Sequence, residues 1–295
     1  MKEEFIIDKY NPKRDKAQIE LMLLNNNYLI KRFNNDEECN KDNILVALVE
    51  ATPIGYLSFS GFDRRPQATL FVSEKYDAMN IGSMLIKKYE SILIPNEKVE
   101  HTIFTCFHCD NELIRVFKNN GYRLYFSEFL MERISESFPL DEITVRNYDD
   151  NDYFQWDRIC ELALYHLRQM IGVYPSYFYI PAEWEREKFA NNKDNMFVMI
   201  VDNTIVAIGE IEGNLIHRVA VSVEHQSRGY GRAFVKYLIN EILSRGEDKV
   251  ILEVAKDNFA KTLYESLGFK ETKFYQHYVK YFRPDTRLSA PPDNY

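Results

Sequence analysis

Residues 226–233 read Gln-Ser-Arg-Gly-Tyr-Gly-Arg-Ala, and this stretch decides the fold of the C-terminal half of the chain. It follows a strand predicted over Leu215–Val223 and opens a helix predicted over Gly231–Ser244. The first amides of a helix lack intrahelical partners and carry partial positive charge. Two glycines open the approach to these amides, and two arginines add mobile positive charge. The stretch therefore predicts a cradle for a pyrophosphate.

The spacing of the glycines excludes two common phosphate-binding loops. The stretch has no Gly-Lys-Ser/Thr, so it is not a Walker loop, and it lacks the G-x-G-x-x-G of dinucleotide folds. A bare G-x-G would be weak support for any ligand. Here a Val-x-Val strand, a Gln/Arg-x-x-Gly-x-Gly/Ala loop and a helix occur together, and this combination is specific.

On these residues the C-terminal half resembles the GNAT superfamily of N-acetyltransferases, which use acetyl-CoA as co-substrate and need no metal. The resemblance implies that backbone groups of Val221 and Val223 pair with the pantetheine arm. It implies that Asn258 contacts the pantetheine and that Tyr264 protonates the departing thiolate. It also implies a pyrophosphate site made of Gln226, Ser227, Arg228, Gly229, Tyr230, Gly231, Arg232 and Ala233.

The expected reaction moves an acetyl group from acetyl-CoA to a primary amine by direct attack, with no covalent enzyme intermediate. The departing thiolate gains from protonation by a placed acid, and the amine must lose a proton to a base. Three residues could serve as that base, and we favour Glu210 slightly over Glu212 and His217. The alternative is a coenzyme-binding sensor without turnover, because a fold does not by itself determine function.

The first half of the chain repeats the pattern of the second half. Val72–Gly82 aligns without gaps to Val221–Gly231, and Asn111–Tyr122 aligns to Asn258–Phe269, at offsets of 149 and 147 residues. We therefore predict an α/β (α+β) fold of two tandem GNAT-like domains, each a mixed, mainly antiparallel sheet flanked by helices. The expected domains are residues 1–138 and 139–295, with the boundary in the polar segment Ser135–Asp141.

The N-terminal copy departs from the motif at its key positions. Asp77 stands in the place of Gln226, Asn80 in the place of Gly229 and Phe117 in the place of Tyr264. A carboxylate repels phosphate, and a phenyl ring has no proton to donate. We expect this copy to lack coenzyme binding and catalysis and to have a structural or substrate-shaping role.

Composition limits the class of partner. The chain of 295 residues has a formal net charge of −8, which argues against a general nucleic-acid binder. It contains no apolar run long enough for a membrane span and no apolar signal core. With four cysteines, the expected location is cytoplasmic. The expected partner is a small-molecule or peptide amine, with no nucleic acid or membrane, for a monomer or homodimer.

Two further segments leave alternatives open. Cys106-Phe-His-Cys109 could hold a metal, but a single Cys-x-x-Cys is weak, and a buried strand pair is favoured. The aromatic segment Tyr174–Tyr179 could line an acceptor pocket or belong to the core, and the sequence weighs these two equally.

Overall fold

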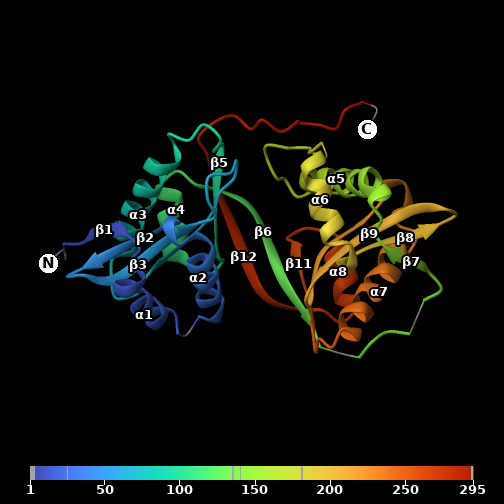
Figure 1. The fold of residues 1–295 in the computed structure, drawn as a ribbon, viewed down its shortest axis with the longest axis horizontal. Helices are drawn as coiled ribbons and strands as arrows, with labels where there is room; N and C mark the ends of the chain where they lie inside the picture. Colours follow the sequence, from blue (N-terminus) through green and yellow to red (C-terminus); the bar gives the residue numbers. More distant parts are fainter. Residues whose placement is uncertain (1–3, 25, 135, 140, 181, 294) are drawn as a thin grey trace. The chain divides into compact units, whose positions relative to one another are not determined.

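A computed structural model describes residues 4–24, 26–134, 136–139, 141–180, 182–293 and 295. The chain forms two compact units (Figure 1). Unit 1 comprises Met1–Tyr125 and Tyr275–Asp285, and unit 2 comprises Phe126–Phe274 and Thr286–Tyr295. Within the described residues, no helix is long and apolar enough to cross a membrane.

The two halves of the chain have the same order of elements, which confirms the predicted fold class. The first half contains β1 (Ile6–Lys9), α1 (Pro12–Leu23), α2 (Asn27–Asn40), β2 (Ile44–Val49), β3 (Thr52–Phe59), β4 (Gln67–Val72), α3 (Ala78–Leu93), β5 (His101–Phe107), α4 (Asn111–Asn119) and β6 (Arg123–Arg133). The second half contains β7 (Thr144–Asn147), α5 (Tyr153–Met170), α6 (Glu183–Asn191), β8 (Met196–Val201), β9 (Thr204–Glu212), β10 (Leu215–Val221), α7 (Tyr230–Ser244), β11 (Val250–Ala255), α8 (Ala260–Ser266) and β12 (Lys270–Tyr281).

Each unit is a mixed, mainly antiparallel sheet with helices on both faces. In unit 2, the strands run β7-β8-β9-β10-β11-β6, and only the β10–β11 pair is parallel. A core with Phe234, Leu238 and Ile242 of α7 fills one face of this sheet. A second core, which includes Trp156 and Cys160 of α5, fills the other face. Unit 1 has the same layers, with α3 and α4 on one face and α1 and α2 on the other.

The parallel strands β10 and β11 separate soon after they pair. Their register covers only Leu215↔Ile251 and Ile216↔Leu252, although β10 runs on to Val221. On its other side, β10 stays paired with β9 up to Val221, with a bulge between Ile216 and Arg218. The far half of β10 therefore keeps backbone hydrogen-bonding groups on the side of β11 for another partner.

The units divide the chain differently from the expected domains. Strand β6, from the first half, pairs with β11 from Val250↔Arg133 to Ala255↔Glu128, and so Phe126–Arg133 belongs to unit 2. The second part of β12, Tyr275–Tyr281, pairs with β5 and belongs to unit 1. The compact units thus exchange strand segments, while the division at 138/139 into two domains stays a prediction. Ser135 and Leu140 of the expected linker lie outside the described residues.

The sequence did not predict helix α2. Helix α1 ends at Leu23, and a second helix starts after Asn26. The Asn26 side chain accepts a hydrogen bond from the Leu29 amide at 3.1 Å and caps α2. An asparagine lies on each side of Asn26 in the sequence, and the polar character of this run hid the start of the helix.

Candidate active site

The loop between β10 and α7 adopts the backbone that a helix-start anion site requires. Strand β10 ends at Val221, and a short 3₁₀ turn, Val223–His225, follows it. Ser227 (φ 61°) and Gly229 (φ 87°) both occupy the left-handed region. Gly229 is the N-cap residue of α7, and no side chain caps this helix. The first amides of α7 are therefore left for a ligand.

The glycines of the loop keep the approach to these amides open. A Cβ atom added at Gly229 would meet no atom within 4 Å, so the space in front of the helix start is empty in the described structure. A Cβ atom at Gly231 would lie 3.5 Å from a methyl of Val221 and would fill the space between α7 and β10. The residues present thus fit a bulky anion such as a pyrophosphate.

A cavity of about 580 Å³ continues from this loop along the free side of β10. Among the residues proposed from the sequence, the cavity brings together Val221, Gln226, Ser227, Gly229, Gly231, Arg232, Asn258 and Tyr264. All of them belong to unit 2. The cavity begins where β10 runs on without β11 beside it, and residues of α7 and α8 line it together.

Tyr264 lies on α8 and is 7% exposed. The rest of its side chain packs in the core of unit 2, where its ring meets Phe269 at 6.0 Å between centroids. Burial raises the pKa of Tyr264 to about 12. The phenol therefore keeps its proton at neutral pH and can donate it.

Asn258 joins β11 to α8 at the wall of the cavity. Its Oδ1 atom accepts a hydrogen bond from the Ala260 amide at 2.9 Å and so shapes the start of α8. This bond uses only the carbonyl end of the side chain, and an amide nitrogen with two donor protons is left for a ligand carbonyl.

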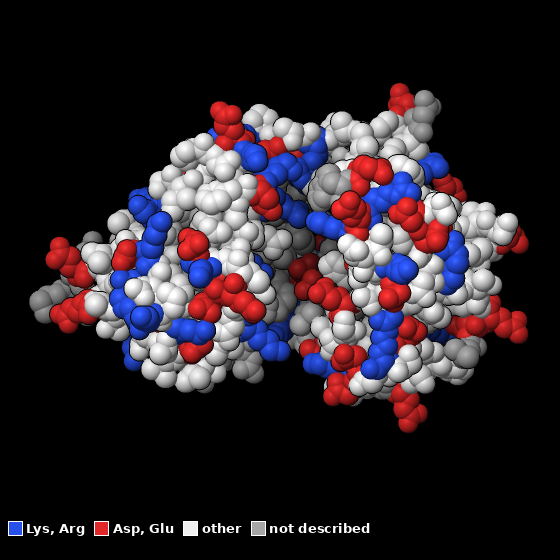
Figure 2. All heavy atoms as spheres, viewed as in Figure 1, with Lys and Arg blue, Asp and Glu red and all other residues white. Residues whose placement is uncertain are grey.

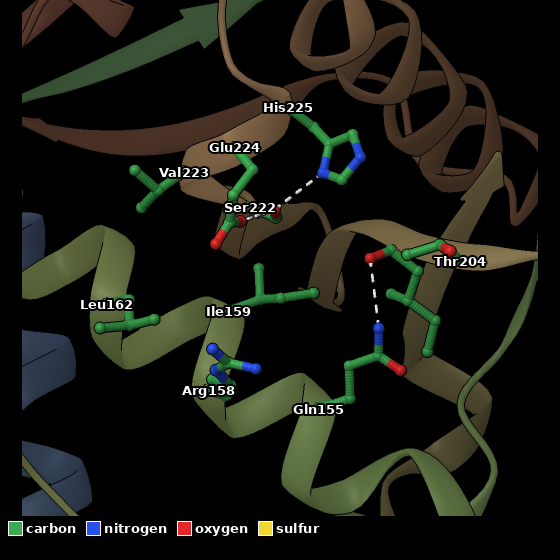
Figure 3. Close-up of a pocket in the computed structure, with 10 residues that line it drawn as sticks. Gln155, Arg158, Ile159, Leu162, Thr204, Ser222, Val223, Glu224 and His225 are labelled. Atoms are coloured by element: carbon green, nitrogen blue, oxygen red, sulfur yellow. Dashed lines mark hydrogen bonds between the residues drawn. The ribbon is translucent and has the colours of Figure 1, made fainter. Parts of the chain in front are cut away.

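A cluster of Ser222, Glu224 and His225 holds the turn before the loop (Figure 3). The Ser222 hydroxyl donates to Glu224 Oε2 at 2.6 Å, and its oxygen lies 2.9 Å from His225 Nδ1. A hydroxyl has one proton, so Nδ1 of His225 is the donor in the second bond. The Ser222 hydrogen bond lowers the pKa of Glu224. Because His225 donates to Ser222, its Nδ1 does not accept the Ser222 proton, and the cluster does not form a Ser–His nucleophile pair.

His225 lies between two cavities. It lines the large cavity, and it also lines a neighbouring one of about 240 Å³ that Figure 3 shows between α5 and the 3₁₀ turn. In the smaller cavity, Gln155 of α5 donates to the Ile205 carbonyl at 3.4 Å. The sequence motifs did not indicate this cluster, because its three residues lie just before the glycine loop and belong to none of the motifs.

Several residues proposed from the sequence lie outside the large cavity. Val223 was expected on the strand, but it lies in the 3₁₀ turn and is 39% exposed, because β10 ends two residues earlier. Arg228 is exposed. Tyr230 and Ala233, on the first turn of α7, do not line the cavity either. Arg232 does line it, and its guanidinium donates to Ser266 Oγ of α8 at 2.8 Å.

The carboxylate favoured as the base lies elsewhere on the sheet. Glu210 is on β9, where Asn192 donates to its Oε1 at 2.8 Å and Arg218 lies 3.9 Å from its Oε2. It does not line the cavity that contains Tyr264. His217 and Glu212 are exposed on β10 and β9. The structure therefore does not bring the three candidate bases to Tyr264.

Helix α5 supplies a wall of the cavity that the sequence did not assign. The wall consists of Ala163, Leu164, His166, Leu167 and Met170. The buried residues of α5 recur at the spacing of a helix with one buried face. The same spacing is expected of a helix that packs only on the sheet, so it gave no signal for a cavity.

The two cysteines of the segment Cys106–Cys109 lie in different environments. Cys106 is buried on β5, and burial raises its pKa to about 12, while Cys109 is exposed after the strand. The favoured buried pair is therefore right for Cys106 and wrong for Cys109. Among the residues that the structure describes, no group of three or more His, Cys, Asp or Glu side chains is placed to hold a metal.

Charge is distributed evenly on the visible surface. Figure 2 shows Lys and Arg interspersed with Asp and Glu over both units on one face of the molecule. This agrees with the mildly acidic composition.

Comparisons with known proteins agree with this geometry. The family model described as Acetyltransferase (GNAT) domain matches residues 172–280. The chain is 31% identical to the [Ribosomal protein bS18]-alanine N-acetyltransferase of Escherichia coli (strain K12), over 39% of this chain and 78% of that protein. The matched region contains the glycine loop, Asn258 and Tyr264.

Solved structures show the same fold over nearly the whole chain. A GCN5-related N-acetyltransferase from Sphaerobacter thermophilus has a TM-score of 0.70 at 16% identity, covering 97% of this chain and 98% of that one. A tandem GNAT protein from the clavulanic acid biosynthesis pathway has a TM-score of 0.61 at 11% identity, covering 98% and 99%. GNAT enzymes use acetyl-CoA as co-substrate, and a cavity that begins at an uncapped helix start suits that molecule. This chain belongs to the GNAT acetyltransferase family, and it is an acyltransferase.

Proposed function

We propose that unit 2 transfers an acetyl group from acetyl-CoA to a primary amine, and that the amine belongs to a peptide or protein. One observation supports this most directly. The uncapped start of α7, the free side of β10 and the Tyr264 side chain all border a single cavity. The curated relative, which is named for acetylating an alanine of a ribosomal protein, supports a peptide amine as the acceptor.

In the proposed complex the loop holds the pyrophosphate through the amides after Gly229, with Arg228 and Arg232 adding positive charge. Val221 and the residues just before it offer backbone groups to the pantetheine arm, and the Asn258 amide contacts that arm from the other side. The thioester then lies between β10 and α8, which both line the cavity.

The chemistry follows from this placement. The neutral amine attacks the thioester carbonyl, the C–N bond forms, and the C–S bond breaks. The Tyr264 hydroxyl gives its proton to the departing sulfur and regains one from solvent or from the ammonium proton that the amine releases. Glu210 stays our prediction for the base that first deprotonates the amine, acting through water because it does not line the cavity.

The decisive experiment follows thiol release from acetyl-CoA in the presence of a panel of primary amines. The panel includes small amines, a peptide that begins with alanine, and the same peptide with its amino terminus blocked as the matched control. We expect release with the free peptide and none with the blocked one. If acetyl-CoA binds tightly but no amine causes thiol release, the chain is a coenzyme sensor and the proposed transfer is wrong.

A further inference from the structure

The C-terminal segment Thr286–Tyr295, called the tail below, packs on unit 2, with bends on both sides of Leu288 and a turn in which the Tyr295 amide donates to the Pro292 carbonyl at 3.0 Å. Its Leu288 carbonyl accepts a hydrogen bond from the Phe178 amide at 2.7 Å, in an isolated antiparallel bridge. Its Ser289 carbonyl accepts one from the Tyr165 hydroxyl at 3.3 Å. The tail therefore lies on the surface formed by α5 and residues 173–180.

The end of the tail is held by contacts of a second kind. Arg158 donates to the Tyr295 carbonyl at 3.0 Å, and the Tyr295 ring packs on Phe178 at 4.7 Å between centroids. The Tyr295 hydroxyl donates to Asp157 Oδ2 at 3.3 Å. At the other end of the tail, the Arg287 guanidinium lies 3.3 Å from the centre of the Tyr177 ring.

Some of the polar contacts of the tail do not depend on its side chains. The hydrogen bonds from Phe178, Tyr165 and Arg158 end on main-chain oxygens of the tail, at Leu288, Ser289 and Tyr295. Every extended peptide presents such carbonyls, and strand-like recognition of this kind draws its affinity from them. The bond to Asp157 suits any donor at that position, including an ammonium group.

The surface under the tail is continuous with the wall of the cavity. On α5, the residues Asp157, Glu161 and Tyr165 follow one another at i, i+4 spacing and so lie on one side of the helix. Leu164, the residue before Tyr165, lines the cavity. On β10, Ala220 lines the cavity, while Arg218, two residues earlier on the same face of the strand, interacts with Asp157 and Glu161. An extended chain on this surface therefore lies beside the place where the thioester is proposed to sit.

We propose that this surface is the binding site of an extended peptide acceptor, and that the tail occupies it until such a peptide displaces it. The proposal rests on the proposed function, since it assigns the acceptor of that same reaction. The ligand class is a peptide chain in extended form, with an aromatic or aliphatic side chain against Phe178 and a hydrogen-bond donor against Asp157.

Asp157 is the carboxyl group of this surface that a hydrogen-bond donor of the bound peptide would contact. Burial and the neighbouring Glu161 raise its pKa to about 7, and the Tyr295 hydroxyl opposes that rise. Glu161 itself has a cationic partner, because Arg168 lies 3.3 Å from it. Glu185 and Arg218 complete the charged groups around Asp157.

The first test deletes the tail from the protein and adds it back as a separate peptide. A variant lacking residues 286–295 should bind a synthetic peptide of that sequence in a calorimeter with one site. The same peptide should inhibit acetylation of an alanine-terminal peptide competitively, and it should not compete with acetyl-CoA. We expect kcat/KM for the peptide acceptor to rise roughly tenfold in the variant, because a tethered competitor is gone.

A second variant keeps the chain at full length in case the deletion does not fold. Tyr295→Ala removes the ring from Phe178 and the hydroxyl from Asp157, and it should lower KM for the peptide acceptor while kcat is unchanged. Asp293→Asn, at an exposed position of the same tail, is the matched control and should behave like the wild type.

Two results would overturn the inference. One is a tail peptide that fails to bind the shortened protein or that binds without competing. The other is an unchanged KM in Tyr295→Ala. If no amine is acetylated at all, the proposed function fails on its own, and competition between the tail peptide and an alanine-terminal peptide for binding still decides the assignment of this surface.

Discussion

Helices α3 and α7 occupy equivalent places in the two halves of the chain, yet they begin in different ways. Helix α3 starts at Ala78, and the Asp77 carboxylate accepts a hydrogen bond from the Asn80 amide at 3.1 Å. Helix α7 starts at Tyr230 after a glycine that has no side chain to offer. Residues 78–80 are helical, whereas the aligned residues 227–229 form a loop with two left-handed residues.

This difference concerns what accepts the hydrogen bonds of the first amides of each helix. The first amides of a helix need an acceptor, and either a side chain or a bound anion can supply it. In α3 the chain itself supplies the acceptor, and the loop has become one more turn of helix. The proposed absence of an anion site in the first half is therefore supported by the capping of α3 as well as by the charge of Asp77.

Helices α4 and α8 also differ at the position where α8 has the proposed acid Tyr264. Phe117 on α4 is fully buried and stacks on Phe104 at 4.8 Å between ring centroids, with Tyr278 also in contact. Its counterpart Tyr264 borders a cavity. Unit 1 therefore uses this position for packing, which is compatible with the proposed absence of catalysis there.

The largest expected effect comes from giving α7 the character of α3. Gly229→Asp places a carboxylate and a Cβ at a φ of 87°, which strains the loop and repels the pyrophosphate. We expect the Kd for acetyl-CoA, measured by calorimetry, to rise at least about 100-fold, or ~3 kcal/mol.

A matched control separates strain from position. Gly246 follows α7, has a φ of 93°, and also has open space around an added Cβ. Gly246→Asp should leave the Kd for acetyl-CoA unchanged. Unaltered binding in Gly229→Asp would mean that the pyrophosphate does not lie at this helix start.

Tyr264→Phe gives α8 the residue that stands at the same position in α4. Loss of the proton donor should lower kcat about 100-fold while the Kd for acetyl-CoA is unchanged. Because the pKa of Tyr264 is raised to about 12, the phenol stays protonated, and the wild type should lose no kcat from this group up to about pH 10. Stopped-flow and steady-state assays across pH measure both quantities.

Tyr237→Phe is the control for this substitution. Tyr237 lies on α7 in the same unit and packs against Phe197, away from the cavity. Its loss should not change kcat. Equal turnover in Tyr264→Phe and the wild type would remove the acid assignment.

A smaller effect is expected from Gln226→Asp, which copies Asp77 into the second motif. Gln226 Nε2 donates to the Val221 carbonyl at 3.1 Å, and a carboxylate would lose this bond and repel phosphate. We expect the Kd for acetyl-CoA to rise roughly tenfold. Gln226→Asn is the neutral control, and the charge argument is wrong if both variants weaken binding equally.

The smallest expected effect comes from changing α3 instead of α7. Asp77→Ala removes the cap of α3 and should lower the free energy of unfolding by about 1 kcal/mol, measured by urea denaturation. It should not create a second site, so calorimetry should still show one acetyl-CoA per chain. Glu74→Ala, at an exposed position before α3, should leave stability unchanged, and an equal loss in both variants would contradict the capping role.

The sequence predicted those parts of the site that depend on neighbours in the chain. The loop 226–233, the start of α7 and the placement of Asn258 and Tyr264 around α8 are local patterns, and the structure brings most of their residues to one cavity. Arg228, Tyr230 and Ala233 lie outside the cavity. Val223 lies outside it too, because the end of β10 depends on where its pairing with β9 stops.

Other parts of the site could not be predicted in this way. The wall from α5, the cluster of Ser222 with Glu224 and His225, and the distance of Glu210 from the cavity all depend on how elements pack. Apolar spacing on α5 tells that one face is buried, but it does not tell whether a sheet or a cavity lies opposite.

What the sequence determined by itself is the repeated order of elements and the chemistry of one helix start, because both arise from short-range backbone preferences and side-chain types. Only the tertiary structure decided that β6 completes the sheet of unit 2, that Tyr275–Tyr281 completes the sheet of unit 1, and that the tail lies on α5. The physical reason is that backbone hydrogen bonds are the same for every strand. A free sheet edge can therefore accept a strand from a distant part of the chain, and the choice is made by packing in the whole molecule.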